Sequence, residues 1–287
     1  MQPILADLLH LLKLERIEDN IFRGESRDIG SPRVYGGQVL GQALSAASAT
    51  VADDRHVHSL HAYFLRAGDV DADIVYDVDR ARDGRSFSNR RVTAIQHGRQ
   101  IFNMTASFQV AEDGIEHQNR MPEVPAPEEL SDIRELTAAM LDQIPEKMHR
   151  FYMHERPFEV RPVHPIALLS PEKAEPRQQF WFRAIDALPD DPEVHRSLLA
   201  YVSDYQLVAT STLPHEIVFD RSTLQLASLD HAMWFHRAFR LDEWLLYSMD
   251  SPNACGARGL ARGEIFSHTG DLVASTAQEA LVRIWTA

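Results

Sequence analysis

The sequence has one cysteine, Cys255, among its 287 residues, so a disulfide within the chain is impossible. A reducing compartment fits best, and we expect the protein to be cytoplasmic. No apolar run approaches the roughly 20 residues that a membrane-spanning helix needs. The first residues include Asp7 and lack a basic segment followed by a long apolar core, so we expect no signal peptide.

Basic residues are scarce relative to acidic ones. The chain has 29 Lys and Arg against 42 Asp and Glu, a formal net charge of −13, and it has no lysine- or arginine-rich run. Its long-range field repels a phosphate backbone, so nucleic acid is not an expected partner. A small anionic substrate is still compatible with this charge, because local arginines can dominate within a Debye length of roughly 8 to 10 Å.

Common catalytic signatures are also absent. The sequence has no Gly-x-Ser-x-Gly, no Walker sequence and no Gly-x-Gly-x-x-Gly, which argues against a nucleophile-elbow hydrolase, a nucleotide hydrolase and a dehydrogenase. Three histidines lie close together, at His56, His58 and His61, but without a carboxylate at metal-site spacing. We expect hydrogen-bonded structural roles for them and for His231 and His236; a metal site or a catalytic His58 is the alternative.

The first half of the chain reads as two helices followed by strands. Leucines at helical spacing predict a helix over residues 4–14, and a glycine-opened stretch from Tyr35 to Thr50 predicts a helix that packs closely against a sheet. From Val57 onward, β-branched and aromatic runs alternate with the turns at residues 82–85 and 96–99, which predicts consecutive antiparallel strands.

Residues 112–135 are acidic and rich in proline, which predicts an exposed connector. We therefore expect an N-terminal unit over residues 1–115, a connector over 116–150 and a C-terminal unit over 151–287. The second half repeats the strands and the helix of the first. Its predicted strands cover residues 158–163, 178–185, 224–236, 244–249, 257–267 and 272–284, with a helix at about 192–207.

The two halves also have identical residues at several positions when they are aligned at one spacing. Phe64 and Phe235, Tyr76 and Tyr247, and Arg91 and Arg262 are each 171 residues apart. A helix wrapped by a curved antiparallel sheet, present twice in one chain, predicts an α+β fold of the double hot-dog type.

Polar residues in the second half are candidates for catalysis. Asp204 lies near the end of an otherwise apolar helix, where partial burial would raise its basicity. Ser228 and Gln278 lie on predicted strands, and their counterparts 171 residues earlier are Val57 and Ser107. Because this polar set occurs in one half only, we expect one active site per chain, in the C-terminal unit.

Four stretches resemble the acyl-CoA thioesterase II family, and the likeness extends from Leu14 to Gln278. The stretches are residues 34–44, 61–69, 82–87 and 229–236. The resemblance implies a double hot-dog fold and hydrolysis of fatty acyl-CoA to fatty acid and CoA, with no metal and no cofactor. It places the catalytic residues at Asp204, Ser228 and Gln278. Some bacterial relatives have threonine at position 228, and many have proline where this chain has Ala67.

The resemblance suggests that Asp204 accepts a proton from a water held by Ser228 and Gln278. Direct attack by Ser228, giving an acyl-enzyme, is the competing route. A hydratase or dehydratase acting on acyl thioesters and a non-catalytic acyl-CoA sensor are alternative functions.

A homo-oligomer, dimer or tetramer, is expected by analogy. Two arginine sets are candidates for CoA phosphates or for a solvated face: Arg80, Arg82, Arg85, Arg90 and Arg91, and Arg258 with Arg262.

Overall fold

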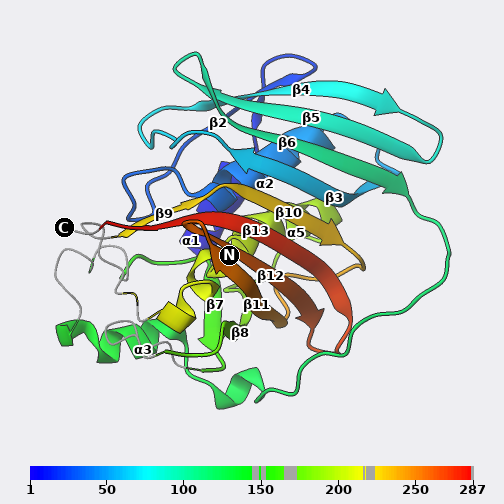
Figure 1. Ribbon diagram of the computed structural model, residues 1–287. Helices are drawn as coiled ribbons and strands as arrows, with labels where there is room; N and C mark the ends of the chain where they lie inside the picture. The colour runs from blue at the N-terminus through cyan, green and yellow to red at the C-terminus, as the bar shows by residue number, and fades with distance from the viewer. Residues whose placement is uncertain (144–148, 150–152, 165–172, 216, 218–223, 286–287) are drawn as a thin grey trace.

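The computed structural model describes residues 1–143, 149, 153–164, 173–215, 217 and 224–285, and their strands form one antiparallel sheet of 13 strands (Figure 1). The strand order is β1-β2-β4-β5-β6-β3-β10-β13-β12-β11-β8-β7, with β9 paired to β13. The N-terminal strands are β1 (Glu15–Arg16), β2 (Ile21–Gly24), β3 (Arg55–Phe64), β4 (Ile74–Asp83), β5 (Phe87–Gln96) and β6 (Arg99–Val110). The C-terminal strands are β7 (Phe158–Pro162), β8 (Arg177–Ala184), β9 (Leu224–Ser228), β10 (Asp230–Phe235), β11 (Leu245–Cys255), β12 (Arg258–Ser267) and β13 (Leu272–Ile284).

The two halves of the sheet have matching irregularities. In the first half one extra residue, His58, separates the pairs Val57–Phe108 and Ser59–Ser107. In the second half Leu229, which is 171 residues further along, separates β9 from β10 at an equivalent bulge. The register shifts of β4 against β5 recur in β11 against β12 at the same spacing, and those of β5 against β6 recur in β12 against β13. Such bulges are specific local features, so their recurrence confirms the predicted double hot-dog fold.

The repeats join along one strand pair. β3 and β10 run antiparallel, with Leu60 opposite Met233 and Ala62 opposite His231. This pairing removes two exposed sheet edges and makes the two curved sheets continuous.

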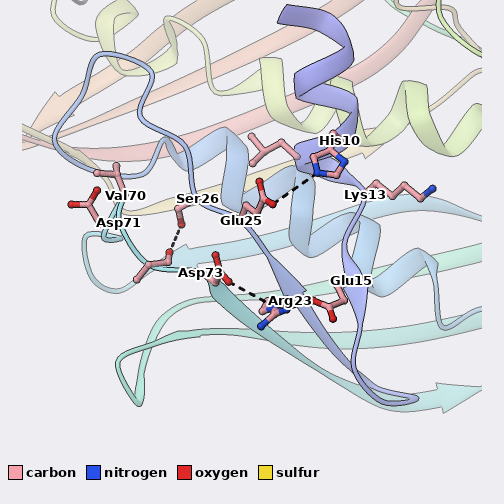
Figure 2. Close-up of a pocket in the computed structure, with 11 residues that line it drawn as sticks. His10, Lys13, Glu15, Arg23, Glu25, Ser26, Val70, Asp71 and Asp73 are labelled. Atoms are coloured by element: carbon pink, nitrogen blue, oxygen red, sulfur yellow. Dashed lines mark hydrogen bonds and ion pairs between the residues drawn. The ribbon is translucent and has the colours of Figure 1, made fainter. Parts of the chain in front are cut away.

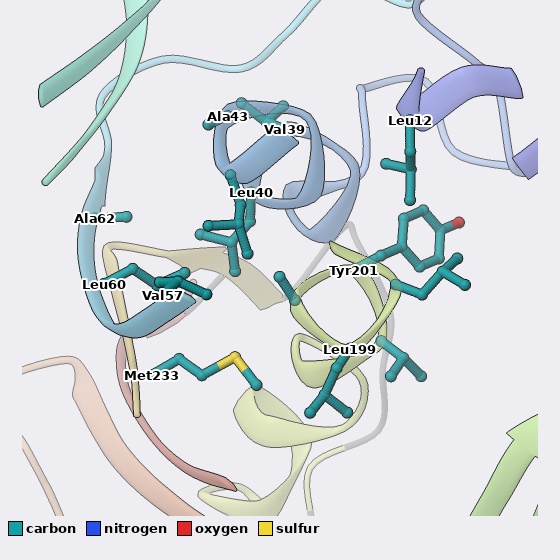
Figure 3. Packing of buried hydrophobic residues seen from close by; sticks show 14 of the residues in the cluster. Leu12, Val39, Leu40, Ala43, Val57, Leu60, Ala62, Leu199, Tyr201 and Met233 are labelled. Carbon is teal, nitrogen blue, oxygen red and sulfur yellow. The ribbon is translucent and has the colours of Figure 1, made fainter. Parts of the chain in front are cut away.

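Each repeat has one central helix, α2 (Gly36–Ser48) in the first and α5 (Pro192–Ser203) in the second. We expected the glycines of α2 to permit close packing on a sheet, but they face the other helix. A Cβ on Gly37 would lie 2.1 Å from the Tyr201 carbonyl oxygen, and one on Gly41 would lie 3.0 Å from that of Ser197. Apolar residues of α2, including Leu40, fill the space toward β3 (Figure 3). The helix is thus enclosed on both sides.

Several element boundaries differ from the sequence prediction. The N-terminal helix α1 covers Pro3–Leu12. The helix expected to reach residue 207 ends at Ser203, with Asp204 as its C-cap. Gln206, which has a left-handed conformation with φ of 65°, then separates it from a short helix α6 (Leu207–Thr210). A 3₁₀ turn, η3 (Leu213–His215), follows α6. The single strand expected over residues 224–236 is divided at Leu229.

The connector is partly folded against the second repeat. It contains η1 (Pro127–Glu129), α3 (Ile133–Ala139) and η2 (Leu141–Gln143). The Trp181 indole donates a 2.9 Å hydrogen bond to the Pro125 carbonyl, and Met121 and Val124 pack on the same apolar cluster. The expectation of an exposed connector was therefore incomplete. Its predicted end at residues 150 and 151 lies outside the described residues. Among those that are described, no helix has the length and apolar character needed to cross a membrane.

Candidate active site

Asp204 lies at the C-terminal cap of α5, where the helix ends against the first turn of α2. Its Oδ2 accepts a 3.1 Å hydrogen bond from the Gly37 backbone N–H. Its Oδ1 is buried and accepts no hydrogen bond of good geometry from the described residues. Burial raises the pKa of Asp204 to about 6, against the opposing effects of the polar groups of Gln278, Gly37 and Ser228. The carboxylate is therefore ionised at neutral pH and more basic than usual.

Ser228 and Gln278 lie beside this carboxylate on neighbouring strands. Ser228 is the last residue of β9, opposite Ala280 of β13, and Gln278 is two residues earlier on β13. The Gln278 amide donates a 2.6 Å hydrogen bond from Nε2 to the Ser228 Oγ. Both side chains contribute to holding the pKa of Asp204 down, so the structure brings together all three residues predicted from the sequence.

His231 also belongs to this polar group, although the sequence analysis assigned it only a hydrogen-bonded structural role. It is fully buried on β10. Its Nδ1 lies 2.8 Å from the Gln278 Oε1, and its Nε2 lies 3.0 Å from the Ser203 Oγ. Burial lowers the pKa of His231 to about 4, so the ring is neutral at physiological pH. The expectation of a hydrogen-bonded role was correct, but the proximity to Gln278 was not predicted.

The N-terminal repeat contributes backbone to the site. Gly36 and Gly37 form the first turn of α2, which has no acidic residue of its own there. A Cβ on Gly36 would lie 2.7 Å from the Asp204 Oδ2, so only glycine permits this approach without a shift. The positive end of the α2 dipole therefore faces a carboxylate from the other repeat. The prediction of a site confined to the C-terminal unit was incomplete.

The remaining sequence candidates lie in separate local contacts. His58 Nε2 is 2.8 Å from the Ser107 Oγ, His56 Nδ1 is 3.4 Å from Glu193, and the His61 ring meets Trp234 edge-on. In the part of the chain that the structure describes, no group of three or more metal-ligating side chains is arranged to hold an ion.

The arginine sets are largely engaged within the protein. Arg90 is buried and donates to the Thr50 Oγ1 at 2.8 Å and to the Asp83 Oδ1 at 2.7 Å. Arg258 pairs with Glu279 at 2.9 Å. Arg262 is paired through its Nε with Asp250 at 3.1 Å. Arg90 is therefore a buried structural residue. It belongs to no solvated face, and it is not placed to bind a CoA phosphate.

Two surface cavities lie apart from the site. The cavity in Figure 2, of about 520 Å³, is lined by charged residues of both signs that include Lys13, Glu25 and Asp73. A second, of about 620 Å³, lies beside Trp181 and Trp244 under the connector. Neither is lined by Asp204, Ser228 or Gln278. The site itself is a partly buried polar group at the junction of the repeats.

Comparisons with known proteins agree with this architecture. Residues 148–281 match the family model described as acyl-CoA thioesterase, and residues 23–109 match that of the acyl-CoA thioesterase N-terminal domain. The chain is 47% identical to acyl-CoA thioesterase 2 of Haemophilus influenzae, over 99% of both chains. It is 42% identical to human acyl-coenzyme A thioesterase 8, over 96% of this chain and 88% of that one.

A solved structure gives the same result in three dimensions. The acyl-CoA thioesterase II TesB2 from Mycobacterium marinum superimposes with a TM-score of 0.80 at 44% identity, over 98% of each chain. Likeness of this extent in sequence and fold shows that this chain belongs to the acyl-CoA thioesterase family.

Proposed function

We propose that this protein hydrolyses fatty acyl-CoA to a free fatty acid and CoA by attack of water, with Asp204 as the general base. The observation that carries the proposal is the buried Oδ1 of Asp204, which has no hydrogen-bond partner of good geometry among the described residues. A carboxylate with a pKa of about 6 is ionised at pH 7 and is basic enough to accept a proton from water.

The reaction balances with water alone as the second substrate. Asp204 takes a proton from water as the oxygen attacks the thioester carbonyl carbon. The tetrahedral intermediate then collapses, the carbon–sulfur bond breaks, and the thiolate of CoA leaves. Asp204 returns its proton to that sulfur. General-base help of this kind contributes typically about 10² to 10⁴ in rate.

Ser228 and Gln278 position the water in this proposal. The Ser228 Oγ accepts from the Gln278 Nε2, so the serine hydroxyl proton is left to donate toward the carboxylate or the water. The N-terminus of α2 adds a positive field that favours the ionised Asp204 and the oxyanion of the intermediate.

We favour water over Ser228 as the nucleophile. Attack by a serine hydroxyl requires a base within hydrogen-bond reach. Both nitrogens of His231 are engaged, one with Ser203 and one with Gln278. Asp204 is the remaining base nearby and lies within reach of Ser228 as well as of a bound water. Attack by water needs no covalent step, so it is the simpler use of this carboxylate.

The proposal also covers the bounds of the repeats, the location of the protein and its assembly. We place the active repeat at residues 151–287, the first repeat at 1–115 and the connector at 116–150, which the extents of the two family matches support. A cytoplasmic location accords with the single cysteine, Cys255, which is free and exposed. A homo-oligomer and a role in fatty acid metabolism follow by analogy with the family.

Thiol release from palmitoyl-CoA tests the function. We expect wild-type turnover and losses of about 10² to 10⁴ for Asp204→Asn, with smaller losses for Ser228→Ala and Gln278→Ala. Ser107→Ala is the matched control, because Ser107 occupies the position of Gln278 in the first repeat, and we expect it to retain wild-type activity. Absence of thiol release at every chain length would contradict hydrolysis and favour a hydratase or a sensor.

A further inference from the structure

The imidazole of His231 joins α5 to the active-site amide. Its two nitrogens face two different oxygens, the Oγ of Ser203 on one side and the Oε1 of Gln278 on the other. All three residues are buried: His231 and Ser203 have no exposed surface, and Gln278 is 1% exposed. Bulk water therefore does not substitute for either contact.

The placement of the protons follows from these partners. The Gln278 Oε1 accepts hydrogen bonds only, so the facing Nδ1 of His231 must carry a proton. The ring is neutral, so its Nε2 is bare and faces the Ser203 Oγ, whose single proton has two acceptors within reach, this nitrogen at 3.0 Å and the Ala200 carbonyl oxygen at 2.9 Å. The amide is then held with Nε2 toward Ser228, to whose Oγ it donates at 2.6 Å.

The opposite tautomer would reverse every bond in this series. A proton on Nε2 would be donated to the Ser203 Oγ, whose own proton would go to the Ala200 carbonyl oxygen 2.9 Å away. The bare Nδ1 would then require the Gln278 amide to turn over. Its Oε1 would face Ser228 and accept the serine proton, which would no longer be available to Asp204 or to water.

We propose that His231 is a positioning residue whose Nδ1–H tautomer fixes the orientation of the Gln278 amide and thereby directs the hydroxyl proton of Ser228 toward the reacting centre. This role rests on the proposed function of Asp204, Ser228 and Gln278. The ring acts through Gln278 and does not contact the acyl group.

The first repeat supports this assignment by contrast. The residue 171 positions before His231 is Leu60, which is fully buried in the core. The counterpart of Gln278 is Ser107, and that of Ser228 is Val57. The buried imidazole therefore occurs in the repeat that has the amide and the hydroxyl, and an apolar side chain fills the same strand position where they are absent.

Two amide substitutions of His231 distinguish its role in orienting the Gln278 amide from a role in packing alone. The amide nitrogen of asparagine lies as many bonds from Cβ as Nδ1 does, whereas that of glutamine matches Nε2. We expect His231→Asn to keep kcat within about threefold of wild type, while His231→Gln and His231→Leu lower kcat about 10²-fold with KM unchanged, since small misplacements in an active site cost about that much. Thermal unfolding verifies that each variant is folded. Equal losses in Asn and Gln, or a greater loss in Asn, would overturn the proposal.

The tautomer can also be measured in the unmodified protein, independently of turnover. In ¹⁵N-histidine-labelled wild type at pH 7, we expect the ring of His231 to show a protonated Nδ1 and a bare Nε2, with the Nδ1 proton protected from exchange. A protonated Nε2 would refute the assignment. If the wild type releases no thiol from acyl-CoA but shows the Nδ1–H tautomer, then the proposed function fails while the orientation of Gln278 stands.

Discussion

The carboxylate of Asp204 accepts a hydrogen bond from the backbone N–H of Gly37 at 3.1 Å, and these two residues belong to different repeats. The helix end of α5 thus meets the helix start of α2, where a partial positive charge stabilises an anion. The candidate active site is therefore formed by both repeats, although its three polar side chains come from the second.

Gly36→Ala tests this close approach. The added Cβ would lie 2.7 Å from the Asp204 Oδ2 and 3.1 Å from Phe64, so the carboxylate must move. We expect kcat for acyl-CoA hydrolysis to fall about 10²-fold, the typical cost of a displacement of about 1 Å. Gly114→Ala is the control, because a Cβ there meets nothing within 4 Å. Activity of Gly36→Ala within twofold of wild type would show that the approach is not required.

Much of this arrangement could be predicted from the sequence. The apolar helix before Asp204, the polar substitutions at Ser228 and Gln278, and the 171-residue repeat all leave a signal in residue types. The bulge that divides β9 from β10 at Leu229 leaves none, because it depends on strand register.

Three features could not be predicted from the sequence, each for its own physical reason. The contribution of Gly37 is a backbone N–H, which every residue but proline has, and the contact of His231 with Gln278 joins strands that are far apart in the sequence. Arg90 was grouped with exposed arginines because the residue type is usually exposed. In the structure it is buried and donates hydrogen bonds to Thr50, just after α2, and to Asp83 at the end of β4, contacts that depend on the fold.

Asp204→Asn should stabilise the protein while it removes activity. The folded-state pKa of about 6 exceeds the ordinary 3.8, so the folded state holds this proton more tightly than the unfolded state does. The ionised carboxylate therefore costs stability increasingly as pH rises from about 4 to 6, and fully above that range. At pH 8 we expect Asp204→Asn to raise the free energy of unfolding by on the order of 3 kcal/mol, at 1.36 kcal/mol per pKa unit. Denaturant unfolding at pH 8 and pH 3.5 checks this, since the difference should vanish at the lower pH.

Arg90→Lys should destabilise the fold without affecting substrate binding. Lysine lacks the planar set of donors with which Arg90 holds Thr50 and Asp83. We expect a loss of about 3 kcal/mol in the free energy of unfolding, in line with the loss of hydrogen bonds to a charged group. KM for acyl-CoA should not change. A higher KM with unaltered stability would instead indicate that Arg90 binds a CoA phosphate.

Water attack predicts that no acyl-enzyme accumulates. Rapid acid quench during turnover of palmitoyl-CoA, followed by mass spectrometry of the intact chain, should show the unmodified mass at all times. Ser228→Ala should keep measurable hydrolysis, because the hydroxyl positions water and forms no bond to the acyl group. An adduct of palmitoyl mass that disappears in Ser228→Ala would establish the covalent route.

The pH dependence of kcat/KM tests the role of Asp204 most directly. Burial raises its pKa to about 6, and the base must be ionised to act, so kcat/KM for palmitoyl-CoA should rise with pH through an apparent pKa of about 6 and level off above pH 7. In Asp204→Asn this limb should disappear and the plateau should fall by about 10² or more. A wild-type profile that stays flat down to pH 4.5, or an Asp204→Asn enzyme with the wild-type limb and plateau, would contradict general-base catalysis by this carboxylate.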